Sequence, residues 1–447
     1  MRKLLLLIAC MNIFLSCQNE NTVVVKLQKN NPDNTPETVF PEDTDMDSLQ
    51  ETDDRSDSKE EVIETSREWT FMVYMACDNS LESYGVQDLN EMEAGIQSDD
   101  QLSVVAFVDR HPGFDRTNGN WDSARIYEIK SDSNGNDKTL VSERKASSEL
   151  DIYLKSETEL DSGKNDTLKK FIEYCHRDYE AENYALFLWG IGSGWKGLCY
   201  DGTSNTIMSL SDFGDVMELY TPNFLVLDTD LGMSFETLYE LKNLNMTVAG
   251  FSGINQGSCI NYETFLKRFC ESDRSYGAFT KTLIDYSDSN ICVMETAKIN
   301  PLFENLEALG KSLSEYIDTK DKQKAVMNEF LSNIILYKSS SYPCDGYIDV
   351  MDMTDCLRYY EDSEVSYRAG VLYDSISASV TGKMDASLSI HIIPYISASV
   401  PDQIHSEYYI SDGKKKERKC LFVNDSMYWC PTGQNQSLLD ALFYRLF

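Results

Sequence analysis

Short apolar runs alternate with amphipathic stretches along the middle of the chain. Runs rich in β-branched and aromatic residues predict strands over 70–76, 102–108, 124–129, 184–189, 224–227 and 246–251. Helical spacing of apolar residues predicts helices after the capping residues Asp78-Asn79-Ser80, after Asp161-Ser162-Gly163, and over 209–220 and 235–244. Strands that alternate with helices indicate an α/β fold with a mostly parallel sheet covered on both faces. In such sheets, functional loops gather beyond the carboxyl ends of the strands.

The pattern changes from about residue 301. Amphipathic helices are predicted over 305–316 and 324–337, a strongly apolar strand over 387–395, and a final β-meander over 407–429. We therefore expect a core over 69–300 and a region of helices and β-meander over 301–447. The sequence leaves open whether the second part is a separate domain or a continuation of the core.

The first 17 residues follow the plan of a secretory signal, with Arg2 and Lys3 before an apolar run that is too short to span a bilayer. The run ends in Leu15-Ser16-Cys17, which is typical of bacterial lipoproteins that become acylated on the cysteine. We expect Cys17 to carry the lipid, with a plain signal peptide as the alternative. These features predict a bacterial envelope protein, periplasmic or surface-exposed, that meets the membrane only through its lipid.

Residues 18–68 hold 15 acidic and 5 basic side chains and few large hydrophobic ones. Such a composition buries too little apolar surface to offset the entropy of ordering, so a disordered tether is expected. An acidic partner-binding tail is the alternative. The whole chain has a net charge of −34, which argues against binding nucleic acid because no basic surface is available to displace phosphate counterions.

The chain contains twelve cysteines, and their connectivity does not follow from the sequence. Cys420 and Cys430 lie equally far from Asp425 in an Asn-Asp-Ser turn. A hairpin there would set the two opposite each other within disulfide range, so we consider this bridge a candidate. No cysteine or histidine spacing of zinc type occurs.

Two stretches, YALFLWGIGSGWKG from Tyr184 and NFLVLDTDLGMSFE from Asn223, resemble the two catalytic loops of clostripain-like cysteine peptidases. EWTFMVYMACDNSLE from Glu68 is similar to the first strand and first helix of that family. The similarity is clear over residues 69–257 and weak beyond 301. It implies a caspase-like α/β sandwich.

The resemblance places the family's catalytic histidine at Ile191 and its nucleophilic cysteine at Asp230. A cysteine peptidase needs a thiolate and a histidine that helps to generate it and protonates the leaving amine. Ile191 carries no proton and Asp230 is a poor nucleophile toward amides, so negligible peptidase activity is expected. Relocated nucleophiles, Cys199 or Cys259, are the alternative. The four histidines, His111, His176, His391 and His405, lie outside the loop that matches the family's histidine site.

The resemblance also implies a substrate-binding region. Asp228 matches an acidic residue in the family's pocket for a basic side chain, Gly192 matches a residue of its oxyanion site, and Trp195 belongs to the same loop. Asp228 and Asp230 are two apart, so strand alternation points both to one face, where they would favour a Lys or Arg side chain or a metal ion. No cofactor is expected, although the family resemblance makes calcium plausible with no ligands assigned.

Three hypotheses follow from these observations. The first is a catalytically inactive clostripain-like lipoprotein that binds peptide or protein segments with a basic residue. The second is a hydrolase that uses a displaced cysteine or the carboxylates. The third is a structural envelope protein whose surface or tether acts in place of the cleft.

Overall fold

The computed structural model describes residues 67–447 apart from 99, 136, 255–256, 258, 288–290, 336–346, 384–385, 392–408, 412–415, 419, 430–437 and 439–447. The predicted signal peptide with Cys17, residues 18–66 of the predicted tether, Cys430 and His405 lie outside these residues. The last two residues of the predicted tether, Arg67 and Glu68, instead begin the first strand of the fold. Within the described part, no helix is both long and apolar enough to cross a bilayer.

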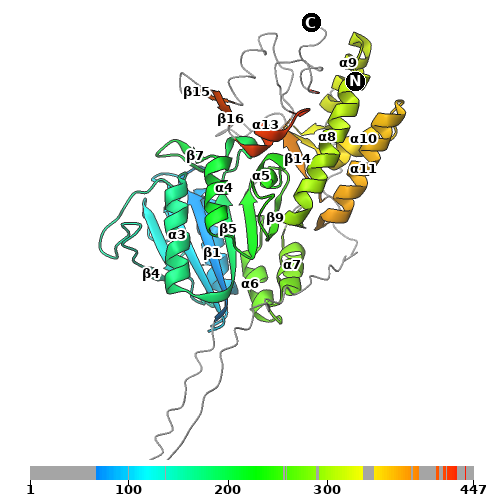
Figure 1. Ribbon diagram of the computed structural model, residues 1–447. Helices are drawn as coiled ribbons and strands as arrows, with labels where there is room; N and C mark the ends of the chain where they lie inside the picture. Colours follow the sequence, from blue (N-terminus) through cyan, green and yellow to red (C-terminus); the bar gives the residue numbers. More distant parts are fainter. Residues whose placement is uncertain are drawn as a thin grey trace, which may run out of the picture. The chain divides into compact units, whose positions relative to one another are not determined.

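A nine-stranded sheet in the order β13-β10-β9-β8-β5-β1-β2-β3-β4 forms the centre of the fold (Figure 1). The five strands from β9 to β2 pair in parallel, and the strands outside them pair antiparallel. The strands are β1 (Arg67–Cys77), β2 (Leu102–Arg110), β3 (Ala124–Glu128), β4 (Glu143–Lys145), β5 (Ala181–Gly190), β8 (Phe224–Thr229), β9 (Thr247–Phe251), β10 (Ile291–Glu295) and β13 (Thr381–Gly382). The predicted parallel sheet is confirmed.

Helices cover both faces of the sheet (Figure 1). One face is covered by α3 (Asn165–Asp178), α4 (Leu210–Leu219), α5 (Phe235–Glu240) and α8 (Ile299–Tyr316), and the other by α2 (Glu82–Gly95), α6 (Tyr262–Cys270) and α7 (Tyr276–Asp285). Alternate residues of β1 show why: Met72 and Tyr74 enter the first apolar cluster, whereas Phe71 and Val73 enter the second. Both faces of the central strands are therefore apolar, as expected for a buried parallel sheet.

The part of the chain after residue 300 shares the apolar cluster of the α3 face. Leu306, Leu372 and Trp429 belong to the same buried cluster as Leu188 and Leu227 of the central strands. The elements of this part are α9 (Lys320–Asn333), β11 (Ile334–Ile335), β12 (Tyr347–Asp349), α10 (Val350–Leu357), α11 (Ser363–Ser379), β14 (Ser389–His391), β15 (Tyr409–Ser411), β16 (Lys416–Arg418) and α13 (Leu421–Asp425).

The predicted elements of this part are only partly right. The helix predicted over 324–337 begins earlier, at Lys320, and ends at Asn333, because Ile334 and Ile335 pair with β12 instead. The meander predicted over 407–429 reduces to the β15–β16 hairpin, and the segment after it is the helix α13. Of the predicted strand 387–395, Ser389–His391 is a strand and the residues from 392 lie outside the described part.

Candidate functional site

Ile191 and Asp230 occupy equivalent positions at the ends of two neighbouring parallel strands. Gly190 and Thr229, the last residues of β5 and β8, are direct partners in the sheet, and Ile191 and Asp230 are the next residues along each strand. Both side chains are buried, with 3% and 6% of their surface exposed. The fold therefore brings together the two positions that the family resemblance assigns to the catalytic pair.

The two loops touch through their backbones. A Cβ atom added at Gly192 would lie 2.1 Å from the carbonyl oxygen of Asp230, so only glycine fits there without a shift of the backbone. The loop after β5 closes through a hydrogen bond from the Ser193 N–H to the Gly197 carbonyl (2.9 Å) and then enters the hairpin β6 (Leu198–Asp201) and β7 (Thr206–Met208). These contacts hold the loop that carries Ile191 directly against Asp230.

Trp195 is covered by residues from the chain beyond 300. Its indole is 1% exposed and lies 5.6 Å from the His391 ring, centroid to centroid. Its backbone N–H donates to the hydroxyl of Tyr347 (2.7 Å), which also fills the space beside Gly194. Gly194 has φ +53°, a conformation that favours glycine. Trp195 is thus a packing residue in this conformation, and its contact with substrate stays a prediction.

Asp228 lies at the end of β8 and is 5% exposed. The Tyr262 hydroxyl donates to its Oδ2 (2.9 Å). Burial, together with the charge of Asp230, raises the pKa of Asp228 to about 7, against the opposing effect of the Tyr262 hydrogen bond. A neighbouring cation would favour the carboxylate.

The alternation that predicts a common face for Asp228 and Asp230 stops at Thr229, where β8 ends. Leu231 then adopts φ +55° as the chain turns. The carboxylate of Asp230 is nevertheless close enough to raise the pKa of Asp228. The two groups are therefore electrostatic neighbours, although they are not successive positions of one strand face.

The structure places the cysteines proposed as relocated nucleophiles inside the protein. Cys199 is fully buried, and burial raises the pKa of its thiol to about 12, which leaves almost no thiolate at neutral pH. Cys259 is 6% exposed, and its thiol donates to the Gly257 carbonyl (3.5 Å). These surroundings are typical of packed cysteines.

The described histidines have structural surroundings. His176 stacks on Tyr184, and burial lowers its pKa. His391 packs between Trp195 and Tyr347, and His111 lies 4.0 Å from Asp78 Oδ1 through its Nε2. The proximity of His391 to the loop of Ile191 does not follow from sequence reasoning, because it depends on the pairing of β12 with β14.

The hairpin predicted around Asp425 is wrong. Leu421–Asp425, the residues expected to form the turn and one arm of the hairpin, are instead the helix α13, with Ser426 as its C-cap residue. The geometric reason for that disulfide is therefore lost. Cys420 is buried, Cys430 lies outside the described residues, and the pairing itself stays a prediction.

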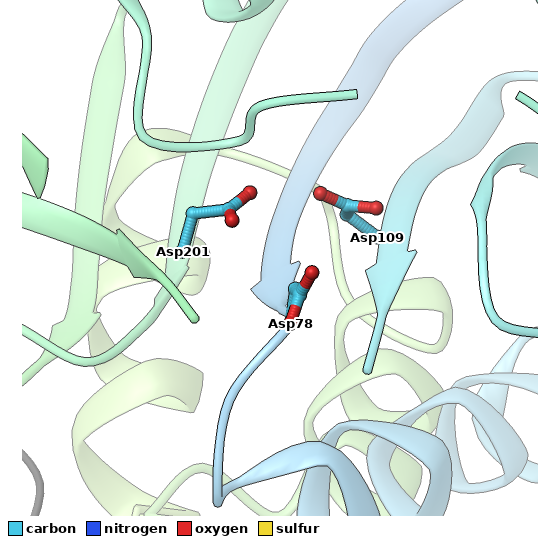
Figure 2. A group of neighbouring side chains, drawn as sticks. All are labelled: Asp78, Asp109 and Asp201. Atoms are coloured by element: carbon cyan, nitrogen blue, oxygen red, sulfur yellow. The ribbon is translucent and has the colours of Figure 1, made fainter. Parts of the chain in front are cut away.

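A group of acidic residues that the sequence analysis missed lies beside this site. Asp78, Asp109 and Asp201 are buried and point toward one another (Figure 2). In the described residues they form the group with oxygens placed to hold a metal ion, and Asp228 and Asp230 are not part of it. A usable signal exists, because Asp78 and Asp109 each follow an apolar run that forms one of two adjacent parallel strands.

Comparisons with known proteins agree with this architecture. The chain resembles the crystal structure of an inactive zymogen C11 protease from Parabacteroides distasonis, with a TM-score of 0.54, 16% identity, and coverage of 75% of this chain and 94% of that one. It also resembles a secreted C11 cysteine protease from Bacteroides thetaiotaomicron in complex with an irreversible peptide inhibitor, with a TM-score of 0.50, 17% identity, and coverage of 76% and 97%. At these identities, the likeness establishes the shared caspase-like α/β fold.

Sequence comparison identifies the family. Clostripain from Hathewaya histolytica is 31% identical over 129 residues, which are 28% of this chain. The match spans only 23% of the length of clostripain, so it does not transfer the activity of that protein. The sequence profile of the Clostripain family matches residues 73–422, which include both loops and most of the part after residue 300. The chain therefore belongs to the Clostripain family.

Proposed function

We propose that this protein is a non-hydrolytic member of the Clostripain family that binds a peptide or protein segment carrying a basic side chain. The observation that supports the proposal is the placement of Ile191 and Asp230, each one residue beyond the paired ends of β5 and β8, Gly190 and Thr229. Neither side chain can form a thiolate or transfer a proton as a histidine does. The loops of the peptidase fold are kept while the two reactive groups are replaced.

The chemistry of Asp228 supports a basic ligand. Its carboxyl is buried, and one oxygen is held by Tyr262. Burial and the charge of Asp230 raise its pKa to about 7. Ionisation of this carboxyl group is therefore less favourable in the folded protein than in water. The guanidinium of an Arg or the ammonium of a Lys at Asp228 would offset that cost through a charge-assisted hydrogen bond. Binding should then strengthen as the pH rises through about 7, since only the carboxylate attracts the cation.

A fluorescence-anisotropy titration with labelled peptides tests this proposal. One peptide carries a central Arg, and its matched control carries citrulline, which keeps the shape and loses the charge. We expect the Arg peptide to bind more tightly by about 10-fold or more, equivalent to one hydrogen bond to a charged group. Asp228→Asn should abolish that preference, whereas Asp212→Asn on the exposed surface of α4 should preserve it.

Mass spectrometry of the same mixtures separates binding from hydrolysis. The peptide should remain intact after prolonged incubation. Cleavage that survives protease-free purification would overturn the non-hydrolytic reading and direct attention to Cys199 and Cys259. Equal binding of the Arg and citrulline peptides, or no binding of either, would overturn the ligand assignment.

We further propose that the protein is a lipoprotein of the bacterial envelope, anchored through Cys17. The support is the sequence alone, with its signal-like segment and the Leu15-Ser16-Cys17 site. Metabolic labelling with an alkyne fatty acid should mark the wild type and leave Cys17→Ser unlabelled. Labelling that persists in Cys17→Ser would contradict acylation at this residue.

A further inference from the structure

Three carboxylates from separate segments converge beside the β1 and β2 strand ends. Asp78 follows the last residue of β1, Asp109 is the penultimate residue of β2, and Asp201 ends β6. One oxygen from each lies within 4.8 Å of the others (Figure 2). All three side chains are buried, so the group is not a solvated acidic surface.

Two of these carboxylates lack the partners that buried charges normally have. Asp78 and Asp109 are both 0% exposed, and within the described part of the chain none of their four carboxylate oxygens has a hydrogen-bond partner of normal geometry, although Glu159 lies beside Asp78 and Ser162 beside Asp109. Asp201 differs, because the N–H groups of Ser162 (2.8 Å) and Ser204 (2.7 Å) hold its two oxygens in place. A buried carboxylate without hydrogen bonds is costly unless it is protonated or coordinates a cation.

The arginine that follows Asp109 in the chain has its own partners. Arg110 follows Asp109, but its Nε donates to Glu82 (2.7 Å) and its guanidinium stacks on Trp121, 4.2 Å from the ring centroid. Its remaining nitrogens bind carbonyl and carboxylate oxygens of the loop after β2. His111 is 4.0 Å from Asp78 and is charged only when protonated.

A fourth acidic group lies beside the three aspartates. Glu159 is a direct neighbour of Asp78, and Asp109 has Asp78 and Asp201 as acidic neighbours. Buried carboxyl groups this close together repel one another when ionised, unless a cation lies between them.

We propose that Asp78, Asp109 and Asp201 bind a calcium ion. A site made only of carboxylate oxygens favours hard cations such as calcium, magnesium and manganese, whereas zinc and copper sites usually include His or Cys ligands. Calcium lies about 2.3–2.6 Å from each oxygen, so two ligands on opposite sides of it are up to about 5 Å apart, and the observed limit of 4.8 Å fits one coordination sphere. Glu159 stands beside Asp78 as a further oxygen donor, and water completes the sphere.

The packing around Asp78 shows that the group is tightly built. The Gly202 N–H donates to the Asp78 carbonyl (2.5 Å). A Cβ atom at Gly202 would come within 2.8 Å of that carbonyl and 3.4 Å of Asp78 Oδ1. Asn79 adds a second link, because its side-chain amide donates to the carbonyls of Ala76 (2.8 Å) and Tyr200 (2.9 Å). The ends of β1 and β6 are therefore fixed against each other at the proposed site.

The proposed ion has a structural consequence for the neighbouring loop. Asp201 ends the strand that directly follows the loop of Ile191 and Gly192. The Tyr200 N–H also donates to the Ile191 carbonyl (3.2 Å). Calcium at Asp201 would hold this strand to the ends of β1 and β2, and so stabilise the fold without touching Ile191 or Asp230.

Calorimetry and thermal unfolding of the full chain test the proposal. After treatment with EGTA and its removal, titration with CaCl2 should show saturable binding with one site. At about 100 times Kd, calcium should raise Tm by roughly 3–5 °C. MgCl2 at the same concentration should raise Tm much less, because magnesium demands a tighter octahedral shell. TbCl3 should give luminescence sensitised by nearby Tyr and Trp residues, displaced by calcium.

Asp78→Asn and Asp109→Asn should each weaken calcium binding by about 10-fold or more, because affinity follows the number of ligand charges. Without calcium, each variant should have a Tm equal to or above that of the wild type, since one repelling carboxylate is removed. This signature distinguishes ligands from residues that only support the fold. Asp166→Asn, on the exposed face of α3, is the matched control and should bind calcium like the wild type.

Three results would overturn the proposal or its assignment to calcium. One is the absence of saturable calcium binding in the wild type. Another is an unchanged calcium affinity in both Asp78→Asn and Asp109→Asn, which would place any bound ion elsewhere. Equal stabilisation by magnesium would overturn the assignment to calcium.

Discussion

Gly192 lies so close to Asp230 that a Cβ atom would sit 2.1 Å from the Asp230 carbonyl oxygen. This contact joins the two loops that the family resemblance assigns to catalysis. Gly192→Ala should lower the free energy of unfolding by about 1–3 kcal/mol, because the backbone of one loop must move. Urea unfolding measures the change. Gly370→Ala is the control, since nothing lies within 4 Å of its Cβ and it sits inside α11, where alanine should stabilise by about 0.5–1 kcal/mol.

Ile191 and Asp230 follow directly on the paired residues Gly190 and Thr229, and this placement predicts that the missing peptidase chemistry can be rebuilt. We expect the double variant Ile191→His, Asp230→Cys to hydrolyse peptide substrates ending in Arg or Lys, with a rate above either single variant by on the order of 10³. Release of a fluorogenic group reports the activity, and an iodoacetamide-treated sample is the control. A folded but inactive double variant would show that the loops no longer hold a catalytic geometry.

Asp228 predicts a pH dependence of stability. Its pKa is about 7 in the folded protein against an ordinary value of 3.8, so its favourable contribution is present below about pH 4 and is lost as the pH rises through 7. Asp228→Asn removes this loss. The variant should therefore gain stability over the wild type as pH increases from 4 to 8, reaching roughly 2–4 kcal/mol.

Paired urea unfolding of wild type and Asp228→Asn across this range isolates the effect. The comparison is needed because Glu236 and Glu240, whose pKa values burial also raises to about 7, titrate in the same range in both proteins. A stability difference that does not change between pH 4 and 8 would show that Asp228 ionises normally.

The hydrogen bond from the Trp195 N–H to Tyr347 predicts a coupling between the loop and the later part of the chain. Tyr347→Phe leaves this buried donor without its partner and should cost about 1–3 kcal/mol. Tyr367→Phe, at a residue that is 60% exposed, should change stability by less than about 0.5 kcal/mol. Thermal unfolding compares the two. Equal stability of both variants would show that Tyr347 contributes only its ring.

The sequence predicts the central sheet well, because its strands are apolar on both faces and the helices between them keep helical spacing. The start of α2 shows the limit of such reasoning. Asn79 does accept the Leu81 N–H (2.9 Å), as expected of a residue before a helix. Asp78 has no such role and turns its carboxylate into the acidic group. The capping preference of a residue depends on its local sequence, so it does not predict contacts with residues of neighbouring strands.

The part after residue 300 is less predictable for a physical reason. Its strands are short: β11, β12 and β14, which form a three-stranded sheet, have two or three residues each. An alternation of two or three residues is too brief to predict a strand from sequence. Around Asp425, the Asn-Asp-Ser sequence favours a turn, but Phe422 and Trp429 enter the apolar cluster of the α3 face. Burial of these side chains selects a helix there over the predicted hairpin.

The apolar cluster that crosses residue 300 determines how the chain responds to a broken backbone. Side chains on both sides of that residue, among them Leu227 and Leu306, are sequestered in one cluster. A single proteolytic cut in a surface segment breaks one peptide bond but leaves the buried apolar contacts in place. Those contacts contribute about 25 cal/mol of free energy for each Å² of apolar surface that they remove from water. The two fragments would therefore elute together in gel filtration under native conditions and separate only in denaturant. A native size measurement alone would not reveal that the chain had been cut.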